Sequence, residues 1–319
     1  MSATVVHGQV AGFPAVTLRN ERLLAVVLPT LGGRVWELED RIRKRQWIWH
    51  RPDVPLQASQ VGADYDAAWA GGWEELFPND APGAFEGRDL PDHGEWWALP
   101  WTVTASSSGT EARLVMTTRS SIIRAECTKE FVLAADASTL SVRYTIRSEE
   151  PGACHFLFKQ HLPIAVSPSC RLQMPGGRMQ TVDPAFGTMV SGPGPYFWPQ
   201  AEAVDGASVD MRVVPEPSPT TREFLYLREV PEGWCGVVDQ ACGASLRLAF
   251  DRSVMPYVWL FLSYGGWRGV YAAVLEPCTN MPKDLAQAVQ LGQSARLDPG
   301  AVFTTTVTVT LGGLDRAEA

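Results

Sequence analysis

Three titratable side chains from distant parts of the sequence could together move protons on and off a neutral substrate. His93 lies in WAGGWEELFPNDAPGAFEGRDLPDHGEWWALPW (residues 69–101), His161 lies in the strand-like run CHFLFKQHLPIAV, and Glu276 lies in AVLEPCTNMPKDLAQAV (residues 273–289). Burial can tune the pKa values of imidazole and carboxyl groups towards neutrality. Such a set can give a proton to one oxygen of a substrate while taking a proton from another.

Each of these residues also has a purely structural interpretation. His161 could be a hydrogen-bonded histidine of the core, His93 could end an Asp-His-Gly turn, and Glu276 could cap the turn at Pro277. Glu276 follows the apolar run VYAAVL, which predicts partial burial of its carboxyl group. Burial is costly for an unpaired carboxylate, so we expect Glu276 to have a charged or hydrogen-bonding partner or a functional role.

The run that carries His161 alternates in a way that predicts a strand over residues 154–162. Its side chains divide between two faces, with His155, Leu157, Lys159 and His161 on one and Phe156 and Phe158 on the other. The phenylalanines would anchor the core and leave a polar stripe that could form a sugar groove, with Lys159 as a substrate contact. The twelve tryptophans could supply flat apolar platforms for sugar rings.

Composition limits the classes of protein that this chain could represent. It has 319 residues, of which 45% are hydrophobic and 19% are charged, so a large core is possible. The net charge is −8 and the only basic run is RIRKR (residues 41–45), which we expect to form a solvated hairpin turn. Nucleic acid is therefore not an expected partner.

The chain shows no signal for secretion or for a membrane. Its N-terminal segment lacks a basic start followed by an apolar stretch, and no window of 18 apolar residues occurs. The six cysteines (127, 154, 170, 235, 242 and 278) form no C-x-x-C pair. We expect buried free thiols in a reducing compartment, and hence a cytoplasmic location.

The elements that must position these residues read as short strands between turns. In TLSVRYTIRS (residues 139–148) apolar and polar residues alternate strictly, which is typical of half-buried antiparallel strands. QWIWH (residues 46–50) is another expected strand. Turn signals recur every 8–15 residues and helical patterns between strands are missing, so the sequence predicts an all-β protein with one large antiparallel sandwich.

One helix is expected near the C-terminal end. Asn280 could cap it, Pro282 would lie near its first turn, and Gly292 would end it. DYDAAWA (residues 64–70) could form a helical turn. Strand patterns of one style run along the whole chain, so we expect a single domain over residues 1–319.

Several segments, in order, resemble the aldose 1-epimerase (galactose mutarotase-like) family. VLPTLGGRVWELEDRIRKRQWIWHRP is similar to its opening, GGWEELFPND with HGEWWALPW to its first histidine segment, and FKQHLPIAV to its second. LEPCTNMPKDL resembles the late Glu-Pro segment and SARLDPGAVFTTTVTVTL the closing turn and strand. The likeness spans roughly residues 20–311, and its ordered set of motifs is more specific than any one of them.

The resemblance implies a large antiparallel β-supersandwich that interconverts the anomers of an aldose. Glu276 would be the general base on the C1 hydroxyl group, His161 the general acid on the ring oxygen, and His93 a donor that shares the developing charge. The resemblance implies no metal ion and no organic cofactor. A small-molecule sugar is the implied partner.

Substrate contacts are predicted less directly. Residues close to His93 in the motifs could hold sugar hydroxyl groups or only satisfy loop backbone, namely Arg34, Trp73, Glu74, Glu75 and Asn79. Sugar-phosphate mutarotases of the family carry arginines where this chain has Ala70 and Trp97, so a neutral or differently decorated ring is expected. The family's substrate-holding aspartate has no clear counterpart, and the candidates are Asp205, Asp210 and Glu223.

Two other functions remain open at the level of sequence. A protein of this fold could bind a sugar without catalysis, or it could be a carbohydrate-active hydrolase or lyase. Hydrolysis would need a second carboxylate within about 5–10 Å of Glu276. Nucleotide-binding and serine-hydrolase motifs are missing, and Cys154, His155 and His161 lack a zinc spacing.

Overall fold

Antiparallel strands make up most of the computed structural model, which describes residues 2–314. Within that range every pair of hydrogen-bonded strands runs antiparallel. The prediction of an all-β protein built from antiparallel sheets is confirmed. Strand alternation places one side chain in two towards the interior, which lets two sheets share a core.

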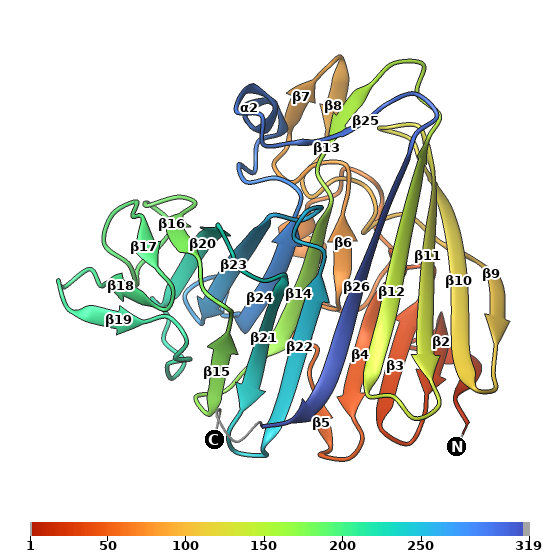
Figure 1. Cartoon of the computed structure of the whole chain (residues 1–319), viewed down its shortest axis with the longest axis horizontal. Helices are drawn as coiled ribbons and strands as arrows, with labels where there is room; N and C mark the ends of the chain where they lie inside the picture. The colour runs from red at the N-terminus through yellow and green to blue at the C-terminus, as the bar shows by residue number, and fades with distance from the viewer. Residues whose placement is uncertain (1, 315–319) are drawn as a thin grey trace.

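An eight-stranded sheet forms the front layer in Figure 1. Its strands, in order across the sheet, are β15 (Cys170–Gln173), β21 (Trp234–Asp239), β22 (Ala244–Phe250), β26 (Val302–Gly313), β12 (Thr139–Ser148), β11 (Ala125–Ala134), β10 (Glu111–Ser120) and β9 (Thr102–Ser107). The strand predicted over residues 139–148 is therefore confirmed as β12. Its alternate apolar side chains are fully buried, as the pattern requires: Leu140, Val142, Tyr144 and Ile146.

Two further sheets lie behind this layer (Figure 1). One has nine strands in the order β19 (Ser208–Asp210), β18 (Gln200–Glu202), β17 (Tyr196–Phe197), β16 (Arg178–Thr181), β20 (Arg222–Arg228), β23 (Tyr257–Tyr264), β24 (Tyr271–Cys278), β14 (Lys159–Ala165) and β6 (Glu74–Leu76). The other has five, in the order β1 (Thr4–Val10), β2 (Phe13–Arg19), β3 (Leu23–Leu28), β4 (Arg34–Asp40) and β5 (Arg45–Gln46). Isolated bridges join the two sheets, pairing Val35 with Trp73 and Ile48 with Ile164.

The core lies between these layers. Its largest cluster of buried apolar side chains draws on all three sheets, for example Val27 from the five-stranded sheet, Val142 from the eight-stranded sheet and Leu260 from the nine-stranded sheet. Burial of apolar surface contributes roughly 25 cal/mol per Å², so this shared core fixes how the layers sit on each other.

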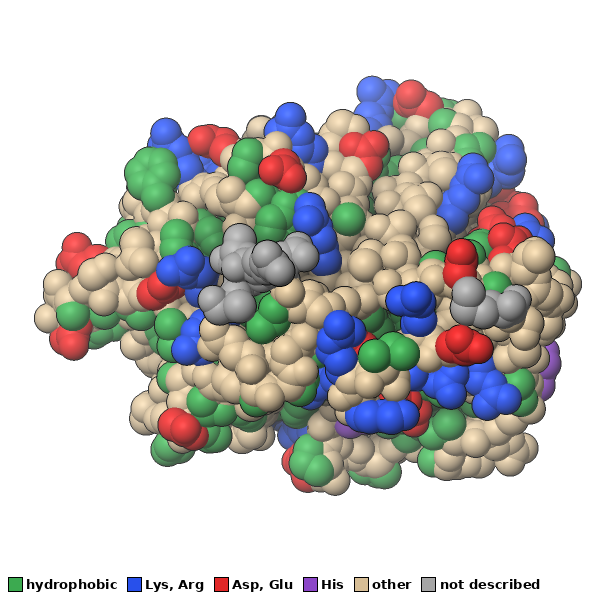
Figure 2. Space-filling view, turned by 60° about the horizontal axis from the view of Figure 1, so that its bottom comes forward, with side chains coloured by type: hydrophobic (Ala, Val, Ile, Leu, Met, Phe, Trp, Pro, Cys, Tyr) green, Lys and Arg blue, Asp and Glu red, His purple; other side chains and the backbone are tan. Residues whose placement is uncertain are grey.

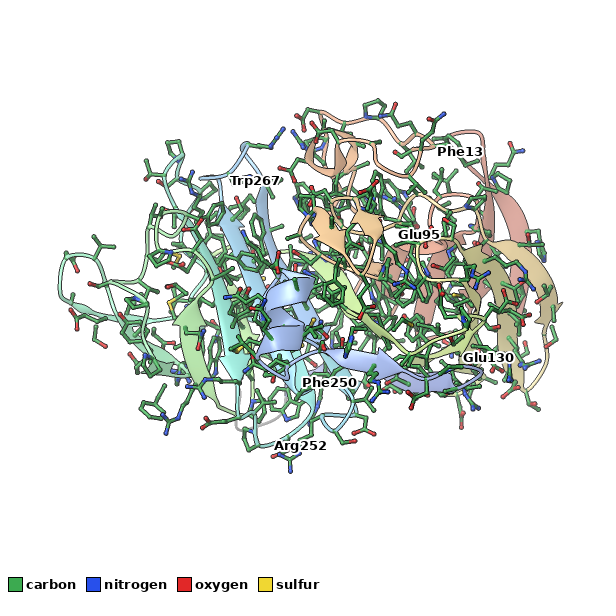
Figure 3. The ribbon with its side chains drawn as sticks, turned by 90° about the horizontal axis from the view of Figure 1, so that it is seen from above. Phe13, Glu95, Glu130, Phe250, Arg252 and Trp267 are labelled. Atoms are coloured by element: carbon green, nitrogen blue, oxygen red, sulfur yellow. The ribbon has the colours of Figure 1, made fainter. Side chains whose placement is uncertain are left out.

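Smaller elements cover one end of the strands, as Figure 3 shows from above. They are the hairpin of β7 (Gly83–Phe85) and β8 (Arg88–Leu90), the pair of β13 (Cys154–Phe156) and β25 (Ala295–Leu297), and the helix α2 (Leu285–Gln290). The other helix, α1 (Tyr65–Ala68), lies beside β6 and β14, where Tyr65 contacts Glu74 and His161. The expected late helix is α2, but its N-cap is Asp284 rather than Asn280. Asp284 accepts the backbone N–H of Gln287, whereas Asn280 is buried and accepts the N–H of Ala295.

Two expected strands are shorter than their patterns predict. The segment 154–162 is interrupted, because β13 ends at Phe156 and pairs with β25, while β14 begins at Lys159 in the nine-stranded sheet. His155 therefore does not share a face with Lys159. In the segment 46–50 only Gln46 belongs to a strand. Ile48 makes an isolated bridge to Ile164 of β14, and His50 makes one to Gly71.

The expected cysteine and hairpin features can be located in the structure. Among the described residues all six cysteines are free thiols, with Cys242 exposed and the others buried. The basic run forms the turn between β4 and β5, although Arg45 is mostly buried against Asp239. Acidic and basic side chains are interspersed on the face shown in Figure 2. No helix within residues 2–314 is long and apolar enough to cross a membrane.

A buried charge pair joins the front layer to β6. Lys129 of β11 is fully buried, its ammonium group contacts the carboxylate of Glu75, and it donates to the carbonyl of Gly32 at 2.9 Å. Tyr144 donates to the same carboxylate at 2.5 Å. The indole of Trp101 lies 4.4 Å from the ammonium group. Glu75 is thus fully engaged inside the core.

We predict that Lys129→Met lowers the free energy of unfolding by about 3–5 kcal/mol, because it leaves the carboxylate of Glu75 buried without a cation. Chemical denaturation followed by tryptophan fluorescence measures the change. Lys44→Met, at an exposed turn position, is the matched control and should change stability by less than about 0.5 kcal/mol. Equal effects of the two substitutions would contradict a structural role for the buried pair.

Candidate functional site

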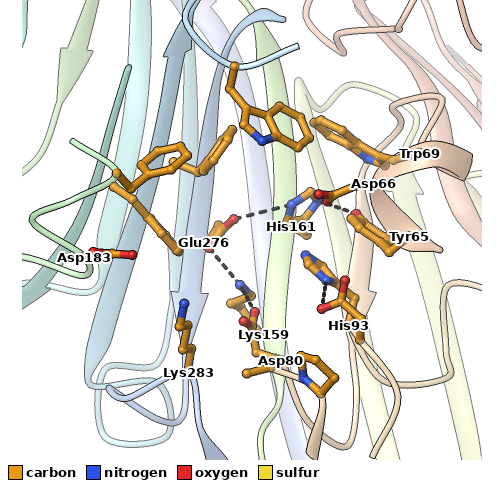
Figure 4. A pocket seen from close by; sticks show the side chains of 17 residues that line it. Tyr65, Asp66, Trp69, Asp80, His93, Lys159, His161, Asp183, Glu276 and Lys283 are labelled. Carbon is orange, nitrogen blue, oxygen red and sulfur yellow. Dashed lines mark hydrogen bonds and ion pairs between the residues drawn. The ribbon is translucent and has the colours of Figure 1, made fainter. Parts of the chain in front are cut away.

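One cavity of about 260 Å³ opens beside β14 and β24 (Figure 4). Its floor is polar and includes Lys159, His161 and Glu276. Aromatic side chains also line it, among them Trp69, Trp267, Phe186, Phe224 and Phe261. Trp267 lies on the loop between β23 and β24, as Figure 3 also shows. A concave site with apolar walls and a few convergent polar groups is typical of small-molecule binding.

Strand alternation places two of the predicted residues side by side. Lys159 and His161 are two positions apart on β14, so they point to the same face and both line the cavity. Gln160, between them, points to the core, where its carbonyl accepts the indole N–H of Trp73 at 2.9 Å and lies 3.2 Å from the hydroxyl oxygen of Tyr144. One face of β14 thus carries the side chains that line the cavity, and the other face is hydrogen-bonded to the core.

Glu276 reaches the same floor from the neighbouring strand, β24. Its Oε1 atom lies 3.4 Å from Nε2 of His161, and its Oε2 atom lies 2.9 Å from Nζ of Lys159. Only 2% of its side chain is exposed, in agreement with the predicted burial. Burial raises its pKa above the ordinary value, and the charge of Lys159 opposes that rise.

Lys159 is the hub of this floor. Its buried ammonium group also contacts Oδ2 of Asp80 at 2.5 Å, and it lies 4.1 Å from the ring centroid of Trp259. Burial alone would lower its pKa, but the carboxylates of Asp80 and Glu276 outweigh burial and raise it, so Lys159 stays protonated. The ammonium group thereby ties the loop after β6, which carries Asp80, to β14 and β24.

His161 is held in a different electrostatic state. Its side chain is 6% exposed, and burial together with the charge of Lys159 lowers its pKa well below the ordinary value. Its Nδ1 atom lies 3.3 Å from the hydroxyl group of Tyr65. Tyr65 belongs to α1, whose first turn is capped by Asp64 through the N–H of Ala67. The imidazole is therefore neutral near pH 7, with a defined partner on each nitrogen.

His93 enters from a loop that closes on itself. Its backbone N–H donates to the carbonyl of Asp80 at 2.7 Å, and its φ of 61° places it in the left-handed region. Gly94 follows with φ 66°, where a side chain would meet the carbonyl of Phe77. The imidazole stacks on the ring of Tyr65, with centroids 3.7 Å apart.

The pKa of His93 moves opposite to that of His161. Burial alone would lower it, but the hydrogen bond between Nδ1 and Asp92, at 3.0 Å, and the carboxylate of Asp80 raise it above 6.5. His93 and His161 face each other edge to face with ring centroids 6.0 Å apart. The cavity therefore holds one imidazole that favours its proton and one that resists it.

The predicted site residues divide into two groups. His93, Lys159, His161 and Glu276 line one cavity, whereas Arg34, Trp73, Glu74, Glu75 and Asn79 do not. Asn79 donates to the carbonyls of Ala81 and Pro91 and so shapes the loop. Arg34 and Glu74 form a buried ion pair of 3.0 Å beneath the floor. These residues therefore form hydrogen bonds and ion pairs inside the protein, which was the structural alternative to sugar contact.

Other lining residues were not singled out by the sequence. Tyr65 lies in the segment expected to form a helical turn, and Asp80 follows Asn79, which is one of the predicted sugar contacts. Asp183 lines the cavity, whereas Asp205, Asp210 and Glu223 do not. Buried Glu223 instead accepts backbone N–H groups, including that of Val190 at 3.1 Å. The side chain of Asp183 accepts the backbone N–H of Ala185 in a local turn. Turns of this kind leave no periodic pattern in the sequence, so Asp183 could not be identified from it.

The charged groups that line the cavity are carboxylates, imidazoles and lysines. Within residues 2–314 no group of three or more His, Cys, Asp or Glu side chains could hold a metal ion. Lysines but no arginines line the cavity, so the planar guanidinium fork that favours phosphate is missing there.

We predict that the two imidazoles titrate on opposite sides of pH 6.5, as NMR of their ring protons would measure, with His93→Asn and His161→Asn for assignment. Because its folded pKa is raised, His93 contributes stability that is present below about pH 6.5 and lost as the pH rises through its folded pKa. Because its folded pKa is depressed, His161 contributes stability that is present above about pH 6.5 and lost as the pH falls. Protonation of His161 above pH 6.5 would contradict this electrostatic assignment.

Known proteins resemble this chain in fold. No protein-family model matches the sequence, and no curated protein does. Solved structures with the galactose mutarotase-like fold do match, so the chain has that fold, as the sequence predicts.

Three solved structures illustrate the likeness. A provisionally assigned aldose 1-epimerase from Klebsiella pneumoniae has a TM-score of 0.75 at 15% identity, over 99% of this chain and 84% of that one. A galactose mutarotase-like protein from Clostridium acetobutylicum has a TM-score of 0.71 at 12% identity, over 98% and 99%. Another provisionally assigned aldose 1-epimerase, from Escherichia coli K12, has a TM-score of 0.66 at 17% identity, over 98% and 100%.

Proposed function

We propose that this protein is a carbohydrate mutarotase that interconverts the anomers of an aldose without phosphate. The observation that carries the proposal is the contact between His161 and Glu276, 3.4 Å apart on the floor of one cavity. A hemiacetal opens when one oxygen loses a proton and another gains one, so an acid and a base must meet at a single sugar. The solved structures of the same fold that are assigned to aldose 1-epimerases support this reading.

In the proposed reaction Glu276 removes the proton of the C1 hydroxyl group. His161, which takes up a proton from Glu276 when the sugar binds, gives that proton to the ring oxygen, the bond between C1 and that oxygen breaks, and an open-chain aldehyde forms. Rotation about the C1–C2 bond presents the other face of the carbonyl carbon. Closure then returns the proton from Glu276 to the C1 oxygen and the ring-oxygen proton to His161.

Neighbouring residues would support each partner. His93, with its raised pKa, donates a hydrogen bond to the oxygen that develops charge. Lys159 contacts Oε2 of Glu276 and leaves Oε1 for proton transfer. Trp69 and Trp267 offer flat surfaces for the C–H faces of the ring. The cavity of about 260 Å³ lies just under the ~300–1,000 Å³ typical of drug-sized ligands, which suits one monosaccharide.

We predict that the protein accelerates anomer interconversion of freshly dissolved neutral aldoses, as polarimetry and exchange NMR would measure. Glu276→Gln and His161→Asn should each reduce kcat by about 10²-fold or more, because each removes one proton-transfer group. His155→Asn is the matched control, since His155 lies outside the cavity and contacts Glu86 at the surface.

A wild-type rate equal to the spontaneous rate for every aldose in the panel would refute the mutarotase proposal. Calorimetric binding of a sugar in that case would favour a protein that binds a sugar without catalysis. Equal losses in the His155 and His161 variants would place the activity outside this cavity.

A glycoside hydrolase is the second candidate, because the cavity holds a second carboxylate. Asp80 and Glu276 contact the same Nζ atom at 2.5 and 2.9 Å, so the two carboxylates lie within two hydrogen-bond lengths of each other. Paired carboxylates at about 5 Å are the equipment of retaining glycosidases. The ammonium group of Lys159 argues against that role, because it contacts both carboxylates and occupies the space between them, where a glycosidic bond would have to lie.

We therefore predict no release of nitrophenol from a panel of nitrophenyl glycosides, as absorbance would measure over hours. Release that Asp80→Asn abolishes would favour the hydrolase instead. Methyl glycosides, which cannot open their rings without cleavage, are the matched control for the mutarotation assay.

The cellular location is proposed on separate grounds. All six cysteines among the described residues are free thiols, which supports a reducing compartment such as the cytoplasm.

A further inference from the structure

A chain of buried polar groups leads away from the cavity behind His161. Nδ1 of His161 lies 3.3 Å from the hydroxyl group of Tyr65, and that hydroxyl group lies 2.5 Å from Oε1 of Glu74. The other oxygen of Glu74 lies 3.0 Å from Nη2 of Arg34. Glu74 and His161 are direct register partners on β6 and β14, so the sheet itself fixes the length of this chain.

The ion pair at the far end determines where the protons lie. Arg34 is buried and always charged, and Glu74 is the one carboxylate within 4 Å of it among the described residues. Burial favours a neutral carboxyl group at Glu74, but that state would leave the guanidinium buried without a counter-charge. Glu74 is therefore ionised and can only accept hydrogen bonds.

An ionised Glu74 fixes every proton between it and the cavity. The hydroxyl group of Tyr65 has one proton, and the short contact commits that proton to Glu74. Only the lone pairs of the phenol oxygen then face His161, so Nδ1 of His161 must be the donor. In a neutral imidazole the other nitrogen, Nε2, is then without a proton.

We propose that Tyr65, held by Glu74 and Arg34, is a positioning residue that keeps the proton of neutral His161 on Nδ1 and reserves Nε2 for exchange with substrate. This inference rests on the proposed mutarotase function. Nothing in the sequence signals it, because Tyr65 and His161 are 96 positions apart.

The assignment explains how the acid and the base share one proton. Nε2 of His161 faces Oε1 of Glu276, and two lone pairs at that distance would repel each other. One proton on the Glu276–His161 pair removes the conflict. In the free protein it resides on Glu276, whose pKa burial raises, and it can move to Nε2 when a sugar binds. When it moves to Nε2, Glu276 becomes the base and His161 the acid, while Tyr65 and Glu74 stabilise the imidazolium from behind as a carboxylate does in a Ser-His-Asp triad.

Other groups around His161 leave this assignment intact. Lys159 and His93 repel a second proton on the ring, and Trp69 meets it edge to face at 5.2 Å. The contact that Nδ1 makes among the described residues is the Tyr65 hydroxyl group.

The test begins with nitrogen NMR of the full-length protein labelled at histidine, at pH 7. In the wild type, His161 should show a protonated Nδ1 and a bare Nε2. In Tyr65→Phe it should shift to the Nε2–H tautomer or to a mixture of tautomers. An Nε2–H tautomer in the wild type overturns the proposal, and this measurement requires neither activity nor a folded variant.

Kinetics supply the second arm. Tyr65→Phe retains the aromatic stack on His93 and should lower kcat for mutarotation by about 10-fold or more with KM changed less than about twofold. Tyr264→Phe is the matched control, since its buried hydroxyl group has no hydrogen-bond partner among residues 2–314 and it lies outside the cavity. An unchanged kcat and an unchanged tautomer in Tyr65→Phe overturn the proposal. A wild type without mutarotase activity refutes the proposed function, and the nitrogen spectra then decide the tautomer alone.

Discussion

The ammonium group of Lys159 is the interaction on which the site depends. It is buried, and it contacts two carboxylates that come from different parts of the chain, Asp80 on a loop and Glu276 on a neighbouring strand. Charges buried in this way must be paired or they cost several kcal/mol each. The paired charges hold the loop against the sheet, and in this arrangement His93 stacks on Tyr65.

Around Lys159, the sheet and the loops contribute different residues to the site. Adjacent strands hold His161 and Glu276, so the atoms that exchange protons are fixed by backbone hydrogen bonds rather than by mobile segments. Loops supply His93 and the aromatic walls, whose positions depend on turns and stacking. Rigid elements thus hold the groups that need sub-ångström precision, and loops hold the groups that shape the cavity.

Sequence reasoning recovered what local pattern controls. Alternation in residues 139–148 predicted β12, and the apolar run before Glu276 predicted its burial. Pattern could not resolve neighbours in irregular loops, so Asn79 was favoured where Asp80 lines the cavity. It could not find Tyr65 either, because the hydrogen bond from that residue to the site is a product of tertiary packing. Residue spacing therefore predicts which face of a strand is buried, but it does not predict which atoms a given polar side chain will bond.

The two faces of β14 have a consequence for how such a protein can change over time. Lys159 and His161 serve the cavity, while Gln160 between them is bonded into the interior. A shift of the strand by one position would exchange these roles and lose both the solvent-facing chemistry and the packing at once. Mutational drift is thereby confined to exchanges that keep the alternation. That freedom is wide enough to be compatible with a fold shared at only 12–17% identity.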